Sequence, residues 1–190
     1  MKKFLLIAVA AFMTLSLSAQ QKFAHVNFSE LVQLCPEADK ARETMEASQK
    51  EAEEVFQSMT DEFETKYRQY EAKASTWTAA IRDSKEKELR DIQTRIQEYN
   101  QQIGTELQQQ QNQLMAPIYT KVNETIQNLA KKGGYIYVFD KSSALYIDDA
   151  QSTDLTPEAR TALGIPADRT LESLQAELQA KAAAQQQAAQ

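Results

Sequence analysis

Residues 52–77 read AEEVFQSMTDEFETKYRQYEAKASTW, with an apolar side chain at every third or fourth position. The members of this stripe are Ala52, Phe56, Met59, Phe63, Tyr67, Tyr70, Ala74 and Trp77. This spacing places them along one narrow face of an α-helix, as in helices that pair with a single partner helix. The stretch therefore predicts a long helix that packs along another helix rather than into a broad core.

A second stripe of the same kind follows after a short interruption. Its members are Leu89, Ile92, Ile96, Tyr99, Ile103, Leu107, Leu114, Ile118, Val122, Ile126 and Leu129. The Ser and Thr residues among 75–78 weaken the helix between the stripes, and Asp83 with Glu86 has the spacing of a capping box for a new helix. We therefore expect an antiparallel hairpin over about 37–132 that turns between Ala74 and Asp83.

Short strand-like segments bracket this hairpin. Residues 23–28 alternate between two faces, residues 135–140 are apolar on both faces, and residues 144–147 have the pattern of a third strand. Because strands lie on both sides of the hairpin, its two ends must meet in one small β body. The candidate core of this body comprises Val26, Ile136, Val138, Leu145 and Ile147.

The predicted fold class is α+β, mostly α. Residues 20–36 and 118–165 form the β body, and residues 37–117 form a long helical hairpin arm. An arm of about 45 residues per helix reaches on the order of 65 Å, at about 1.5 Å per residue. Three short strands do not make a stable sheet alone, and their edges invite pairing with another chain. Several copies that share their strands would solve this problem.

The two ends of the chain differ from the rest. Residues 1–19 hold Lys2 and Lys3, then an apolar run, then Ser18 and Ala19, which is typical of a cleaved signal peptide. The apolar run is short for a bilayer span, which needs about 20 residues, although an uncleaved anchor is the alternative. We therefore expect an exported protein without stable membrane insertion. Residues 166–190 are rich in Ala and Gln and are expected to be weakly helical or disordered, with nothing to bury.

The amino-acid composition narrows the range of possible functions. The full chain has a net charge of −6, and removal of Lys2 and Lys3 leaves 19 basic and 27 acidic side chains, a net charge of −8. This charge argues against nucleic-acid binding, which needs clustered Lys and Arg. Cys35 is the only cysteine, so no internal disulfide forms, and a buried apolar role is expected for it.

The sequence does not favour an enzyme. Catalysis needs convergent acid, base or nucleophilic groups in a cleft, yet the only histidine, His25, lies in a predicted strand beside Phe23. We expect a structural role for His25. The spacing of the carboxylates supplies no metal site, and no glycine-rich phosphate loop is present, so we expect no cofactor.

Several segments together resemble the Skp (OmpH) family of periplasmic chaperones for outer-membrane proteins. They are KFAHVNF at 22–28, APIYTKV at 116–122, GYIYVFDKSSALY at 134–146 and DLT at 154–156. The resemblance covers nearly all of the chain to about Gly164. It implies a homotrimer with a β body and three helical tentacles around a cavity, in which unfolded outer-membrane β-barrel proteins are held without ATP.

Two features depart from well-known members of that family. Those proteins are strongly basic, whereas residues 37–117 of this chain hold 11 basic and 17 acidic side chains. Alongside this difference in charge, we find no counterpart of a lipopolysaccharide-binding motif. The second departure is the additional tail after Pro166.

The aromatic and Met residues of the first stripe have two interpretations. The first is that they join the two helices of the hairpin. The second is that some of them contact unfolded clients, and the candidates are Met59, Phe63, Tyr67, Tyr70 and Trp77. The predicted function is an ATP-independent holdase. The alternative is a secreted coiled-coil structural or adaptor protein that binds one folded envelope partner.

Overall fold

The structure is a computed structural model that describes residues 21–188. The elements in chain order are β1 (Lys22–Val26), α2 (Phe28–Leu34), α3 (Pro36–Lys73), the 3₁₀ turn η1 (Ala74–Thr76), α4 (Ala79–Gly133), β2 (Tyr135–Asp140), the 3₁₀ turn η2 (Lys141–Ser143), β3 (Ser152–Asp154), α5 (Thr156–Leu163) and α6 (Leu171–Ala188). The predicted class, mostly α with a small sheet, is confirmed. The expected signal peptide at residues 1–19 lies outside the described residues.

The chain divides into two compact units. One unit runs to Leu34 and resumes at Lys121, and we call its described part the body; the other unit, Cys35–Thr120, we call the arm. Within residues 21–188, no helix combines the length and the apolar character that a bilayer span needs.

The sheet has the strand order β2-β1-β3, and both pairings are parallel. Ala24 lies opposite Val138 on β2 and opposite Thr153 on β3. Parallel neighbours cannot be joined by a tight turn and need a long crossover connection. Here the connection from β1 to β2 consists of α2, α3 and α4, so the hairpin is an extended crossover between two adjacent strands.

The prediction of a strand at residues 144–147 is wrong. These residues follow η2 as irregular chain, and the third strand is Ser152–Asp154 instead. A strand needs a partner with free backbone groups. In this chain β1 is already paired on both sides, with β2 and with β3. The alternating pattern of residues 144–147 therefore has no edge of β1 left to pair with.

The strand expected at residues 23–28 ends earlier, at Val26, because Asn27 caps α2. The backbone N–H of Glu30 donates to Asn27 Oδ1 at 3.2 Å, and Asn27 Nδ2 donates back to Glu30 Oε2 at 3.1 Å. This reciprocal pair satisfies a backbone donor at the start of the helix. Phe28 is consequently the first residue of α2 rather than the last residue of a strand.

The hairpin turns where the sequence predicts. α3 ends at Lys73, and η1 and Trp77 lead into α4. The start of α4 at Ala79 corrects the expected cap at Asp83: the hydroxyl of Thr78 accepts from the N–H of Ile81 at 3.4 Å. At its other end α4 stops at Gly133, and Gly134 has a φ of +69°, a left-handed conformation that glycine adopts without strain.

The body has a core of its own, in which α2 packs on α5. Its buried apolar side chains are Ala24, Val26, Leu31, Val32, Leu34, Val122, Leu155, Ala159, Leu163, Ile165 and Leu174. Leu174 belongs to α6, which packs on α2. The expectation that the tail after Pro166 buries nothing is therefore wrong, because one leucine of this segment is 4% exposed.

Candidate functional site

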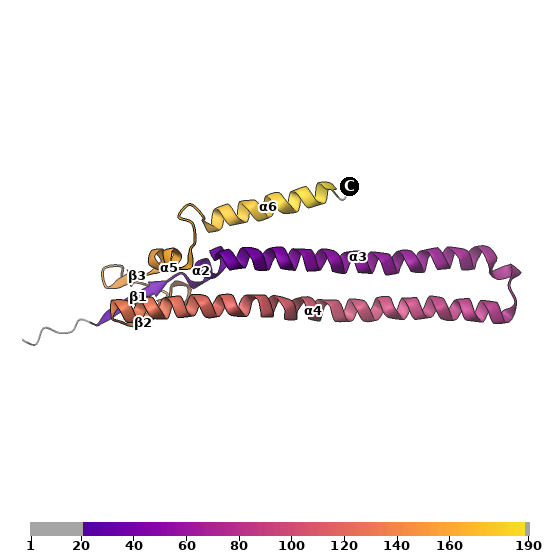
Figure 1. Cartoon of the computed structure of the whole chain (residues 1–190), viewed down its shortest axis with the longest axis horizontal. Coiled ribbons are helices and arrows are strands. Elements are labelled where there is room, and N and C mark those ends of the chain that lie inside the picture. The colour runs from indigo at the N-terminus through magenta and orange to yellow at the C-terminus, as the bar shows by residue number, and fades with distance from the viewer. Residues whose placement is uncertain (1–20, 189–190) are drawn as a thin grey trace, which may run out of the picture. The chain divides into compact units, whose positions relative to one another are not determined.

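Polar contacts join α3 to α4 along the arm, where the two helices lie side by side (Figure 1). The pairs are Ser48 with Gln110, Ala52 with Tyr99, Glu62 with Arg95, Lys66 with Glu88, and Tyr70 with Glu86. The residue number falls along α4 as it rises along α3, as an antiparallel hairpin requires. The predicted hairpin is confirmed, with side-chain hydrogen bonds as well as apolar packing between its helices.

Glu88 is the centre of an ion-pair cluster in the arm. Its carboxylate accepts hydrogen bonds from Lys66 on α3 and from Lys85 on its own helix, the latter at 2.8 Å. These bonds, the one from Lys66 first, lower the pKa of Glu88 from 4.5 to about 2. The same bond raises the pKa of Lys66. Residues 62–95 of the arm are therefore held together by a charged pair as well as by apolar packing.

Apolar burial in the arm is sparse. Between Arg42 and Pro117, a range that the structure describes throughout, Ile92 is the one apolar side chain that is fully buried. The other members of the two stripes are mostly half-buried. Val55, Tyr67 and Ile81 are 37%, 45% and 44% exposed. Sequence reasoning missed Val55 and Ile81 because neither lies on the pairing stripe.

The five candidate client-contacting residues lie in two aromatic groups and one isolated position. Phe63 stacks on Tyr67 with ring centroids 6.0 Å apart, and Tyr70 meets the edge of Trp77 at 6.0 Å beside the hairpin turn. Met59 lies one turn before Phe63. Only Tyr67 among the five is classed as exposed; the other four are half-buried.

Tyr70 and Tyr67 differ in what their hydroxyl groups contact. Tyr70 donates to the carboxylate of Glu86 on α4, and this bond raises the pKa of Tyr70. Glu71, one turn further along the same helix, raises the pKa of Tyr67 through a hydrogen bond. Tyr70 therefore contributes to the pairing of the helices, whereas Tyr67 bonds within its own helix and leaves much of its ring in solvent.

Charge is distributed unevenly along the arm. Residues 62–95, the far half, hold eight basic and seven acidic side chains. Residues 37–61 and 96–117, the near half, hold three basic and ten acidic side chains. The acidic excess of the chain is thus concentrated in the near half, while the far half is almost neutral and cross-linked by ion pairs.

A second candidate surface lies on the body. Ile136, Tyr137 and Phe139 of β2 are 49%, 59% and 52% exposed, and Leu145 and Tyr146 after η2 are 107% and 83% exposed. β2 forms one edge of the sheet, so its outer backbone groups are also unpaired within the sheet. The exposed apolar side chains of this edge form a group, whereas a normal protein surface carries exposed apolar residues singly.

The five residues predicted to form the core of the body are divided between its interior and this surface. Val26 is buried, and Val138 and Ile147 are half-buried. Ile136 and Leu145 lie at the exposed edge. A single chain therefore does not bring the five residues together.

A cavity of about 430 Å³ adjoins the exposed edge. Phe23, Phe139, Tyr146 and Ile147 supply most of its apolar lining, and His25 with Ser152 supplies polar lining. Phe139 and Tyr146 also belong to the exposed apolar set of the body. The cavity and the edge consequently form one continuous apolar surface.

His25 holds two strands of the sheet together. It is 3% exposed, its Nδ1 shares a hydrogen bond with Ser152 Oγ at 2.9 Å, and its Nε2 lies 3.9 Å from Asp154 Oδ2. Both partners are on β3, so the predicted structural role is confirmed. Within residues 21–188, no group of three or more His, Cys, Asp or Glu side chains is placed to hold a metal ion. Cys35 is buried, as expected.

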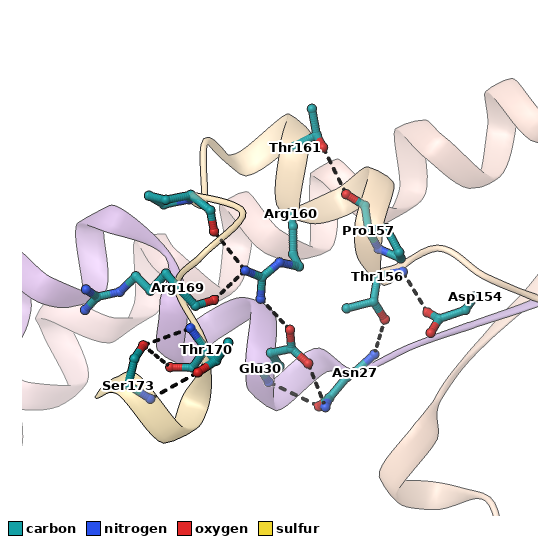
Figure 2. Close-up of polar contacts among 11 residues, drawn as sticks. Asn27, Glu30, Asp154, Thr156, Pro157, Arg160, Thr161, Arg169, Thr170 and Ser173 are labelled. Carbon is teal, nitrogen blue, oxygen red and sulfur yellow. Dashed lines mark hydrogen bonds and ion pairs between the residues drawn. The ribbon is translucent and has the colours of Figure 1, made fainter. Parts of the chain in front are cut away.

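The matched segments DLT and GYIYVFDKSSALY meet at the end of β1, where sequence reasoning assigned no contacts. Asp154 caps α5 by accepting from the N–H of Thr156 at 2.8 Å, and the hydroxyl of Thr156 accepts from the N–H of Asn27 at 2.9 Å (Figure 2). Asp140 accepts from the N–H of Phe28 at 3.3 Å. Hydrogen bonds from Ser142, together with this one, lower the pKa of Asp140. These bonds fix the start of α2 to the end of β2 and to the start of α5.

The fold of this chain is similar to that of a protein described as an OmpH-like outer membrane chaperone. A solved structure from Caulobacter crescentus that carries this description matches with a TM-score of 0.67, over 76% of this chain and 85% of that chain, at 14% identity. That likeness establishes the fold. The chain belongs to the outer membrane protein (OmpH-like) family, whose model matches residues 22–163.

Two relatives in sequence are both called chaperone protein Skp. The protein from Yersinia enterocolitica is 27% identical over 167 residues, which cover 83% of this chain and 96% of the relative. The protein from Pectobacterium atrosepticum is 24% identical over 143 residues, or 75% and 86% of the two chains. Family membership and these relatives support a chaperone role for this chain.

Proposed function

We propose that this chain is a periplasmic holdase that binds unfolded outer-membrane β-barrel proteins without ATP and prevents their aggregation. The observation that carries the proposal is the arm, a long hairpin whose apolar stripe is only partly buried. Such a surface offers many weak contacts and no enclosed site. Export through the N-terminal signal peptide would deliver the protein to the periplasm, where its clients cross as unfolded chains.

Assembly occurs through the body, and the assembled state is a homotrimer. The exposed apolar side chains of β2 and of residues 144–147, together with the adjacent cavity, support this proposal because another copy can cover them. Burial of Leu145 and Ile136 against a second copy would complete the predicted core of Val26, Ile136, Val138, Leu145 and Ile147. Residues 144–147 would then pair with a strand of another copy.

Three arms joined at their bodies would enclose a client. Each contact is weak, but contacts from several arms to one chain act together, so the complex persists longer than any one contact. Tyr67 is the best supported contact among the candidates, because it is 45% exposed and its hydroxyl bonds to Glu71 of its own helix. Trp77, Met59 and Phe63 are partly accessible, and Tyr70 is assigned mainly to helix pairing.

The test is aggregation of several unrelated β-barrel proteins diluted from urea, followed by light scattering. The mature protein is added so that the concentration of its trimer equals that of the β-barrel protein. The control is an unrelated acidic protein at the same mass concentration. A holdase suppresses scattering of all the barrels, without ATP. Protection of none of them, with tight binding to one folded envelope protein, would instead establish the structural or adaptor function and contradict the proposal.

A further inference from the structure

The segment after Leu163 lies beyond the residues that match the family model, yet it is built into the body. Gly164 turns the chain with a φ of +73°, and the next residue, Ile165, is 6% exposed. Leu174, in the first turn of α6, is 4% exposed, and α6 packs on α2. Two apolar anchors therefore attach residues 164–174 to the body.

Arg160 adds a polar attachment to the same segment. Its guanidinium forms an ion pair with Glu30 of α2 and donates to the carbonyl of Pro166 at 2.9 Å and to that of Arg169 (Figure 2). The Arg160 and Glu30 side chains are only 15% and 22% exposed. One side chain of α5 thus connects α2 to the loop that precedes α6, in a partly desolvated setting where charge-assisted bonds are strong.

The start of α6 is also fixed, while the rest of the helix is not. The hydroxyl of Thr170 accepts from the N–H of Ser173 at 3.0 Å, and the hydroxyl of Ser173 accepts from the N–H of Thr170 at 2.9 Å. In contrast, residues 175–187 are all exposed. The attachment of the tail therefore ends at Leu174.

We infer that residues 164–174 act as an intramolecular brace for α2. The surface formed by α2 and α5 is an interaction site, and the chain's own tail occupies this site. α2 is the last element of the body before the arm, since α3 begins two residues after Leu34. A short helix of seven residues is marginal without packing on both of its sides. The brace keeps this helix folded, so the arm begins from an ordered element.

The experiment is hydrogen exchange on the full-length mature protein with changes at two leucines of the same helix. Leu174→Asp removes the buried anchor, and Leu178→Asp makes the same change at a position that is 42% exposed. We expect amides of residues 28–34 to exchange at least about tenfold faster in Leu174→Asp and to change less than about twofold in Leu178→Asp. Amides in the first turns of α3 should follow those of α2.

Two further variants keep the test decisive if Leu174→Asp fails to fold. Leu174→Ala should produce a smaller acceleration of the same amides, and deletion of residues 175–190 should produce none. Unchanged exchange of residues 28–34 in Leu174→Ala, or equal acceleration in the Leu178 control, would overturn the inference. Because the measurement needs no client, its outcome is independent of whether the holdase proposal is correct.

Discussion

The body and the arm contain similar numbers of residues, but different kinds of interaction stabilise them. In the body, α2, α5, the sheet and the start of α6 bury aliphatic side chains together, and backbone-capping bonds from Asn27, Asp154 and Thr156 join these elements. In the arm, one fully buried apolar residue, Ile92, stands between Arg42 and Pro117, and ion pairs bridge the two helices.

This difference predicts that the body is rigid and that the arm is mobile. Buried apolar area is the main source of folding free energy, and exposed ion pairs add little. We therefore expect the body to open only in global unfolding and the far half of the arm to open locally. The proposed holdase function would use this division, because a stable body would keep the copies together while adaptable arms would fit clients of different shapes.

The largest effect is expected for a charge placed in the sheet. Val138→Asp puts a carboxylate at a half-buried position opposite Ala24, and moving a charge out of water into such a position costs free energy. Sedimentation should show monomer or unfolded chain. The matched change in the arm, Val55→Asp, should leave the proposed trimer intact because Val55 is 37% exposed. An intact Val138→Asp trimer would mean that assembly does not depend on this sheet.

The next effect concerns the one buried aliphatic residue of the far arm. Ile92→Ala should destabilise the hairpin by about 2–5 kcal/mol, the usual range for a buried Ile. Local exchange of amides in residues 62–95 measures this loss, and exchange in the body should not change. Ile81→Ala, at a position 44% exposed in the same helix, is the control and should be nearly neutral. Equal effects at both positions would show that apolar burial does not hold the arm together.

A smaller effect, dependent on pH, is expected at Glu88. Its folded pKa of about 2 lies below the ordinary 4.5, so its stabilisation is fully present above pH 4.5 and is lost as the pH falls towards 2. Glu88→Gln should therefore lower the melting temperature at pH 6, and the difference from wild type should shrink as the pH falls through about 2 and vanish below it. Glu64→Gln, which breaks an exposed pair with Arg68, should have little effect at either pH. A difference that is undiminished below pH 2 would contradict this role of Glu88.

The smallest effect is expected from salt. The near half of the arm is acidic and the far half is almost neutral, so electrostatic attraction contributes little to the binding of acidic clients. Client affinity should change only mildly, or rise, from low to high salt. A steep loss of affinity would indicate that the local basic group Arg82, Lys85, Lys87 and Arg90 dominates binding.

The arm could be predicted from the sequence because its signal is local. Apolar residues three and four apart define the pairing face of each helix, and that pattern lies within one short window. The boundaries of the helices were harder to predict. The helix α4 begins at Ala79 because Thr78 caps it, although Asp83 and Glu86 have the better spacing for a capping box.

The body was less predictable because its contacts are distant in sequence. Residues 144–147 alternate like a strand, but whether they pair depends on β1, about 120 residues earlier, and residues 152–154 occupy that edge instead. Leu174 is a lone buried leucine in an Ala- and Gln-rich segment, so no periodic pattern marked it. The bonds of Asn27 to Thr156 and of Phe28 to Asp140 are likewise invisible in any local window. The client-contacting residues stay a prediction.

The most direct test of the division between body and arm is deletion of residues 69–99. This change removes the far hairpin, including Trp77 and Ile92, and leaves β1, β2 and β3 intact. We expect sedimentation to show that the shortened protein still assembles. We also expect light scattering to show that it no longer protects unfolded β-barrels, because the arms no longer enclose them. Full protection by an assembled short-armed protein would place client binding on the body and contradict the account.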